Sequence, residues 1–226
     1  MKTVQKWGGA AALYQAAAYL AAIVFFLFIA NYPSITDPRE KMAFLLKNQL
    51  GMYGMYTAAY VVFGLALVVL TLALYDRLKT GSPAIMQTAA ALGLIWAGTL
   101  IASGMVFTMG MKTVLDLYPK DAGQALTIWL TIESVSSGLS SGNGEILGGL
   151  WTLLVSLAAL RSARLPKALN CLGLAVGFVG LLSALPLLND LTAVFGLTQL
   201  VWFTWLGITL LRKSFSASDS SSILSM

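Results

Sequence analysis

The chain has 226 residues, of which 58% are hydrophobic and only 10% are charged. A soluble domain carries roughly 25% charged residues, so this chain has too few to cover a surface that faces water. Its net charge of +5 comes without a basic arm or a nucleic-acid-binding motif, and we expect no nucleic-acid partner. Cys171 is the single cysteine and histidine is absent, which excludes an intramolecular disulfide, Cys- or His-based metal sites and a histidine base.

Long apolar runs predict helices that cross a membrane. A span needs about 20 largely apolar residues to cross a hydrocarbon core of roughly 30 Å. We therefore expect an all-α fold, a polytopic transmembrane helix bundle of about six spans. It forms one domain over residues 1–213, followed by a short Ser-rich cytoplasmic tail at 214–226. The expected spans are residues 8–29, 52–74, 84–110, 146–160, 168–188 and 193–211, of which the fourth is short for a full crossing.

The connections between these runs differ in charge, and the difference orients the chain. In a six-span arrangement, nine of the fourteen basic residues fall on one side of the membrane, beside only Asp76 and Asp219. The other side carries five basic residues against seven acidic ones. Because short basic connections stay in the cytoplasm, we expect both termini to be cytoplasmic.

Two of the outer connections carry signals for the start of a helix. Asp37 directly precedes Pro38, and Asp121 stands three residues before Gln124. In both arrangements polar side chains can accept hydrogen bonds from the backbone amides that have no partner at a helix N-terminus. The apolar helix that begins after Asp121 is too short to cross, and the Ser- and Gly-rich stretch at 134–144 should end it. It is predicted to be a short outer helix before the fourth span, either interfacial on the membrane surface or re-entrant into it.

Ionisable residues inside spans usually mark a functional site, and the middle of every predicted span lacks them. The nearest acidic residues are Glu133 and Glu145, near the outer surface, with Asn143 and several serines between them. Two carboxylates and several hydroxyls could bind a cation or a polar head group, or could serve acid/base catalysis. The simpler alternative is a solvated outer loop with incidental acidic residues.

Aromatic residues form a second candidate ligand-binding site. Tyr53 and Tyr56 share a face with Tyr60 toward the outer end of the second span, where an interfacial aromatic belt explains the first two. Trp96 and Trp202, like Tyr60, lie deeper than a belt and could line a pocket for an apolar ligand; ordinary helix packing is the alternative.

The outer helix contributes one further aromatic candidate, Trp129. It either covers an outer cavity near Tyr53 and Tyr56 or points away from the bundle to bind another chain. The first arrangement belongs to a binding protein and the second to a scaffold.

Several stretches of the chain, taken together, resemble a known family. They are KWGGAAALYQAAAY, GLIWAGTLIASGM, NGEILGGLW with LLVSLAALR, and VFGLTQLVWFTWLGI. This set is similar to a family of bacterial multi-pass membrane proteins that is known only as a domain of unknown function. The resemblance extends over nearly the whole chain and implies a protein of the bacterial cytoplasmic (inner) membrane. It implies no catalytic or binding residue, because the family has no established activity.

These observations favour a small membrane protein that binds or transports a small or lipophilic molecule through a pocket open to the outer side. Its partners are then membrane lipids and that ligand, with no cofactor and no catalytic residue. The alternative is a non-catalytic accessory or scaffold subunit whose helices pack against another membrane protein or a second copy of the chain. An intramembrane enzyme that uses Glu133 and Glu145 is the least favoured hypothesis, because the chain has no histidine and no nucleophile motif.

Overall fold

The computed structural model describes residues 2–140 and 144–223, and all of the regular structure in these ranges is helical. The all-α fold expected from the sequence is therefore confirmed. In chain order the elements are α1 (Lys2–Ile23), the π-helical η1 (Val24–Ile29), the short η2 (Tyr32–Ser34), α2 (Pro38–Lys47), α3 (Gln49–Tyr56), the π-helical η3 (Thr57–Val62), α4 (Phe63–Leu78), α5 (Pro83–Leu117), α6 (Ala122–Leu139), α7 (Ile146–Ser162), α8 (Lys167–Leu182), the short η4 (Pro186–Leu188) and α9 (Leu191–Ile223).

Four segments are long and apolar enough to cross a membrane: Thr3–Ile29, Gln49–Leu78, Pro83–Leu117 and Leu191–Arg212. The shorter apolar helices α7 and α8 have 17 and 16 residues. At about 1.5 Å per residue each is roughly 25 Å long, somewhat less than the hydrocarbon core. The structure thus supports a multi-pass membrane protein with four full-length spans, and a total of six remains a prediction.

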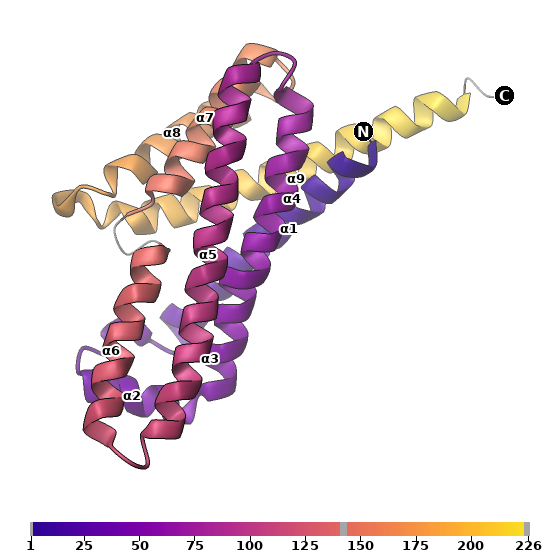
Figure 1. Cartoon of the computed structure of the whole chain (residues 1–226). Helices are drawn as coiled ribbons and strands as arrows, with labels where there is room; N and C mark the ends of the chain where they lie inside the picture. Colours follow the sequence, from indigo (N-terminus) through magenta and orange to yellow (C-terminus); the bar gives the residue numbers. More distant parts are fainter. Residues whose placement is uncertain (1, 141–143, 224–226) are drawn as a thin grey trace.

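The long helix α5 organises the bundle (Figure 1). It has 35 residues, and at about 1.5 Å per residue it extends roughly 52 Å, well beyond a hydrocarbon core. Helices α6 and α7 follow one another along it, α6 beside its lower half and α7 beside its upper half. On the remaining sides α1 packs against α4 and α9, and α8 packs against α7 and α9. The lower end in Figure 1, built from α2, α3, α6 and the end of α5, is called the outer unit below, after the side of the membrane on which the sequence predicts it to lie.

The upper ends of the helices are joined by polar contacts between distant parts of the sequence. The Arg77 guanidinium donates to the carbonyl of Arg164 at 3.2 Å, and that of Arg164 donates to the carbonyl of Arg77 at 2.9 Å. Gln5 accepts from Arg77 at 3.1 Å and donates to the carbonyl of Ala73 at 2.9 Å. The start of α1, the α4–α5 turn and the α7–α8 turn therefore lie at one end, where Leu211 of α9 also packs on Gly9 of α1.

The two predicted helix starts are confirmed by their capping hydrogen bonds. The Asp37 carboxylate accepts from the backbone N–H of Arg39 at 2.7 Å, and that of Asp121 accepts from the N–H of Gln124 at 2.9 Å. These contacts satisfy backbone donors that have no partner within a first helical turn. Both caps lie in the outer unit and fix where α2 and α6 begin.

The outer helix does end within the Ser- and Gly-rich stretch, but α6 runs about two turns further than expected, through Ser134, Ser136 and Ser137 to Leu139. It packs lengthwise on α5, where the buried Ser136 and Ser103 hydroxyls lie 2.8 Å apart and the Ser103 hydroxyl also donates to the Ser136 carbonyl. These contacts within the bundle stabilise a helix that the local sequence alone does not favour. Similarly, α9 continues to Ile223, past residue 214 where the tail was expected to begin.

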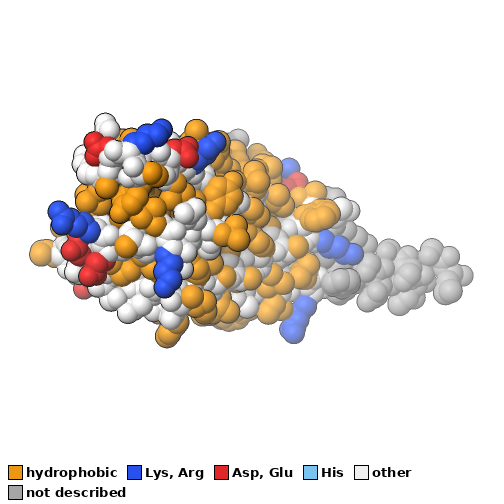
Figure 2. All heavy atoms as spheres, turned by 90° about the horizontal axis from the view of Figure 1, so that it is seen from below, with side chains coloured by type: hydrophobic (Ala, Val, Ile, Leu, Met, Phe, Trp, Pro, Cys, Tyr) orange, Lys and Arg blue, Asp and Glu red, His pale blue; other side chains and the backbone are white. Residues whose placement is uncertain are grey.

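Hydrophobic side chains cover much of the molecular surface, as expected for a bundle in lipid. Viewed from below, Figure 2 shows apolar atoms over most of the visible face and few acidic or basic groups. Large apolar side chains such as Phe28, Leu50 and Leu187 are more than 70% exposed. A contiguous apolar surface of this kind is stable only against lipid or another protein.

Candidate functional site

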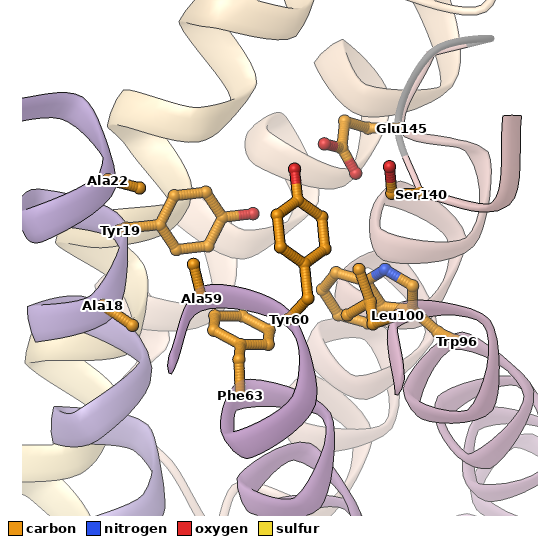
Figure 3. Close-up of a pocket in the computed structure, with 10 residues that line it drawn as sticks. All are labelled: Ala18, Tyr19, Ala22, Ala59, Tyr60, Phe63, Trp96, Leu100, Ser140 and Glu145. Atoms are coloured by element: carbon orange, nitrogen blue, oxygen red, sulfur yellow. The ribbon is translucent and has the colours of Figure 1, made fainter. Parts of the chain in front are cut away.

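A pocket of about 110 Å³ lies where α1, η3, α4 and α5 meet the junction between α6 and α7 (Figure 3). Its wall is mostly apolar and aromatic, with polar groups gathered on one side. It is partly open to its surroundings, so a molecule bound there could extend out of the bundle. The lining residues are Ala18, Tyr19, Ala22, Ala59, Tyr60, Phe63, Trp96, Leu100, Ser140 and Glu145.

The aromatic wall comes from four segments, α1, η3, α4 and α5. Tyr19 of α1 meets Phe63 of α4 edge to face at 5.5 Å between ring centroids, and Phe63 meets Trp96 of α5 in the same way at 6.3 Å. Tyr60 belongs to the π-helical η3 and stacks on Tyr56 at 5.0 Å. A π-helical turn inserts an extra residue and so changes the direction of the side chains around it, which is why such turns are frequent at functional sites.

The backbone around Gly144 directs Glu145 toward the pocket. Gly144 has φ of +87°, and a side chain there would collide with the backbone of Ala184 at the end of α8. The next N–H, that of Glu145, donates to the Ser183 hydroxyl at 3.0 Å, and this hydroxyl donates to the Gly180 carbonyl at 2.7 Å. The start of α7 is thus fixed against the end of α8, and the Glu145 carboxylate points to the Tyr60 hydroxyl (Figure 3).

The Glu145 carboxylate has an unusual environment. Neither of the ion pairs Lys41–Glu133 and Lys79–Asp76 involves Glu145, and the described residues that line its pocket include no lysine or arginine. It lies just before α7, outside the apolar helices, and burial raises the pKa of its carboxyl to about 7. An acid of this pKa changes charge near neutral pH, and a positive ligand would favour its ionised form.

The other predicted carboxylate, Glu133, lies in the outer unit with partners of its own. The Tyr32 hydroxyl donates to it at 2.7 Å, and the Lys41 ammonium lies 3.6 Å away. Burial, together with this hydrogen bond, raises the pKa of the Tyr32 phenol well above its usual range. Because Glu133 is already neutralised and Glu145 lines a separate pocket, the structure does not arrange the two acids as a catalytic pair.

Residues 10–213 match the model of one protein family. The chain belongs to the family described as Domain of unknown function (DUF4386). This finding confirms the resemblance seen in the sequence. Neither the curated proteins nor the solved structures contain a match to the chain. The function of this DUF4386 protein is therefore argued from its own geometry.

The pocket of this DUF4386 protein brings together two of the predicted ligand-binding residues, Trp96 and Glu145. Trp202 lies elsewhere, buried in the core against Trp151 and Phe203. Asn143 lies outside the residues that the structure describes.

The other ligand-binding residues that the sequence predicted belong to the outer unit. Trp129 is fully buried and meets the Phe107 ring edge to face at 5.1 Å, while Tyr56 stacks on the same ring. Tyr53 is half exposed and lines a different, open groove between α3 and α5 of about 770 Å³. Trp129 therefore neither covers the pocket nor offers an anchor on the surface.

Tyr19 is a pocket residue that was not singled out in the sequence, because it stands in a run of alanines that is typical of a packing face. Ser140 was considered only as one of several serines between Glu133 and Glu145. Tyr19 lines the same pocket as Glu145 because α1 packs against η3 in the folded bundle. A local sequence signal for this approach does not exist, because Tyr19 and Glu145 are more than 100 positions apart.

Proposed function

We propose that this chain is an integral membrane protein that binds a small molecule, or the head of a lipophilic one, in the pocket between α1, η3 and α5. The observation that carries the proposal is the half-buried Glu145 carboxylate, which lies against an aromatic wall and has no lysine or arginine among the described residues that line its pocket. A buried charge is costly unless it is paired, so such a group in an otherwise apolar bundle points to a ligand or a proton.

The position of the pocket along the bundle supports access from the outer side. Tyr60 lies about 18 residues from the end of α4 at Leu78, which corresponds to roughly 27 Å along the helix. With the Arg77 end at one face of a core of roughly 30 Å, the pocket reaches the opposite boundary. A ligand head could therefore sit at the level of lipid head groups while an apolar tail stays in the bilayer.

The accessory or scaffold hypothesis is favoured by a different feature, the open groove between α3 and α5. Its walls include the strongly exposed Leu50 and Met109, which offer apolar surface to a lipid or to another chain. The two hypotheses predict that different molecules remain bound after gentle extraction. A binding protein retains a small molecule, whereas a scaffold retains a defined protein.

Filling the pocket tests the binding proposal. In the variant Ala22→Phe, a large side chain enters the pocket, whereas in the matched control Ala21→Phe the added ring points away from it, since Ala21 is exposed on the same helix. We expect the wild-type protein and the control to retain a bound molecule through detergent extraction, as seen by native mass spectrometry, and Ala22→Phe to lose at least about nine-tenths of it. Equal retention by both variants would contradict the proposal.

We further propose that the chain lies in a bacterial cytoplasmic membrane with six spans and both termini inside. The basic residues assigned to the inner side include Arg77 and Arg164, which lie together at the end of the bundle where α1 begins, beside Gln5. This clustering agrees with the rule that short basic connections remain cytoplasmic.

Cysteine labelling of intact cells tests this orientation. In a Cys171→Ser background, single cysteines replace Thr80 in the α4–α5 turn or Thr36 before α2, both of which are exposed. We expect an impermeant maleimide to label the cysteine at position 36 and to reach that at position 80 only after the cells are broken. Labelling of position 80 in intact cells would reverse the orientation.

A further inference from the structure

We infer that the pocket beside Glu145 binds an organic cation, a quaternary ammonium or protonated amine group. This inference rests on the proposed function and names the chemical class of its ligand. The geometry points to it through three features: the charge of the pocket, its aromatic wall and its size.

The charge of the pocket favours a positive group. Among the described residues that line it, Glu145 is the one carboxylic acid, and none is lysine or arginine. The polar side chains beside it are the hydroxyls of Tyr19, Tyr60 and Ser140, which can donate to a carboxylate but cannot neutralise it (Figure 3). An anionic head group would meet an unpaired carboxylate, whereas a cation would supply the missing counter-charge.

The aromatic wall favours an organic cation over a metal ion. Tyr19, Tyr60, Phe63 and Trp96 surround the space in front of Glu145. The face of an aromatic ring attracts a cation through its electron-rich centre, and aromatic cages are the usual sites for quaternary ammonium groups. A divalent metal ion instead requires about six oxygen or nitrogen ligands. The described residues contain no group of three acidic, histidine or cysteine side chains that could supply them.

The size of the pocket limits the group that can enter. A cavity of about 110 Å³ is smaller than the roughly 150 Å³ cavity that holds benzene in an engineered protein core, so it accepts a compact head and not a whole lipophilic molecule. Three of its lining residues, Ala18, Ala22 and Ala59, are small and come from facing turns of α1 and η3. Because the pocket is partly open, a longer substituent can extend out of it.

The protonation of Glu145 makes the affinity of the pocket for a cation depend on pH. The titratable groups that face it are the phenols of Tyr19 on α1 and Tyr60 on η3, which ordinarily titrate near 10; Ser140 and Ser183, from α6 and the end of α8, do not titrate. Since burial raises the pKa of the Glu145 carboxyl to about 7, the free pocket is largely neutral at pH 6 and negative at pH 8. Cation binding should therefore strengthen as the pH rises through 7 and reach a plateau above it.

Choline and its neutral isostere, dimethylbutanol, test the inference on the purified full-length protein by titration calorimetry. The two probes share a shape and differ in charge. We expect choline to bind at least about tenfold more tightly than the isostere at pH 8, and the difference to shrink toward pH 6. In Glu145→Gln the preference for choline should disappear, whereas the matched control Glu133→Gln should keep it, because Glu133 lies in the outer unit.

A second pair of variants tests the aromatic wall. Phe63→Leu should weaken choline binding, and Phe178→Leu, on the exposed face of α8, should leave it unchanged.

The outcomes separate the inference from the proposed function. Equal binding of choline and its isostere, both blocked by Ala22→Phe, would overturn the cation inference and leave the binding pocket in place. Binding of neither probe, together with equal retention of endogenous molecules by Ala22→Phe and wild type, would overturn both.

Lipid nanodiscs of two compositions distinguish the source of the cation. If phosphatidylcholine discs weaken choline binding relative to phosphatidylglycerol discs, the group comes from a lipid head; equal binding in both indicates a free ammonium compound.

Discussion

Replacing Gly177 by valine is expected to prevent α7 and α8 from packing together. A Cβ atom at Gly177 would lie 2.7 Å from the carbonyl oxygen of Gly149 and from the backbone N of Leu153. A Cβ at Gly149 would in turn lie 2.8 Å from the carbonyl oxygen of Gly177. Both obstacles are helix backbone, which cannot rotate aside as a side chain can. Small residues at such positions let helices approach closely in lipid, where hydrophobic burial does not drive their association.

We expect Gly177→Val to lower the free energy of unfolding by about 3 kcal/mol or more, which corresponds to a fall in melting temperature of roughly 10 °C. Thermal unfolding in detergent, followed by tryptophan fluorescence, measures this change. Gly98→Val is the matched control, because nothing lies within 4 Å of a Cβ placed at Gly98 on α5. Melting temperatures that agree within about 2 °C for the two variants would show that α7 and α8 do not touch through their backbones.

Removing the indole of Trp129 is expected to destabilise the outer unit. Trp129 is fully buried among Phe107, Met42, Leu45 and other apolar residues of α2, α3, α5 and α6. Substitution of a buried tryptophan by alanine typically costs about 3–5 kcal/mol, because the apolar contacts are lost and a cavity remains. We expect Trp129→Ala to fall in this range and to make α6 accessible to protease before the rest of the bundle.

Two further tryptophan substitutions make this prediction specific. Trp7 on α1 is 65% exposed, so Trp7→Ala should change the stability by less than about 0.5 kcal/mol. The Trp129 Nε1 has no hydrogen-bond partner, so Trp129→Phe, which keeps an aromatic ring and removes this unsatisfied donor, should cost much less than alanine. If the alanine and phenylalanine variants of Trp129 are equally stable, the outer unit is not held together by this side chain.

The burial of Trp129 also bears on the scaffold hypothesis. A tryptophan that anchors a partner chain has to be exposed in the isolated protein. Trp129 is turned toward α5, and the exposed apolar residues nearest to it in sequence are Leu130 and Val135. Trp129 therefore offers no anchor, and the open groove between α3 and α5, with its exposed Leu50 and Met109, is the better target for tests of association.

The sequence by itself determined the class of the protein and the position of most helices along the chain. Its low charge content and long apolar runs predicted a helical membrane bundle, and the charges of the connections predicted which turns lie together, as the Arg77–Arg164 contacts support. Asp37 and Asp121 marked helix starts that the structure confirms. These features depend on residues close together in sequence or on composition, so they can be read without knowledge of the fold.

Only the tertiary structure decided which side chains meet. In a soluble helix the apolar face shows which side turns inward, but these helices are apolar on nearly all sides, so the pattern does not fix their rotation. The sequence therefore could not show that Glu145 faces Tyr19 and Tyr60 whereas Glu133 pairs with Lys41. It also could not show that α6 continues through Ser134, Ser136 and Ser137 to Leu139, because contacts with α5 outweigh the local preference to break the helix. The pocket exists because four segments from distant parts of the chain pack around η3, and packing of that kind is a property of the folded bundle alone.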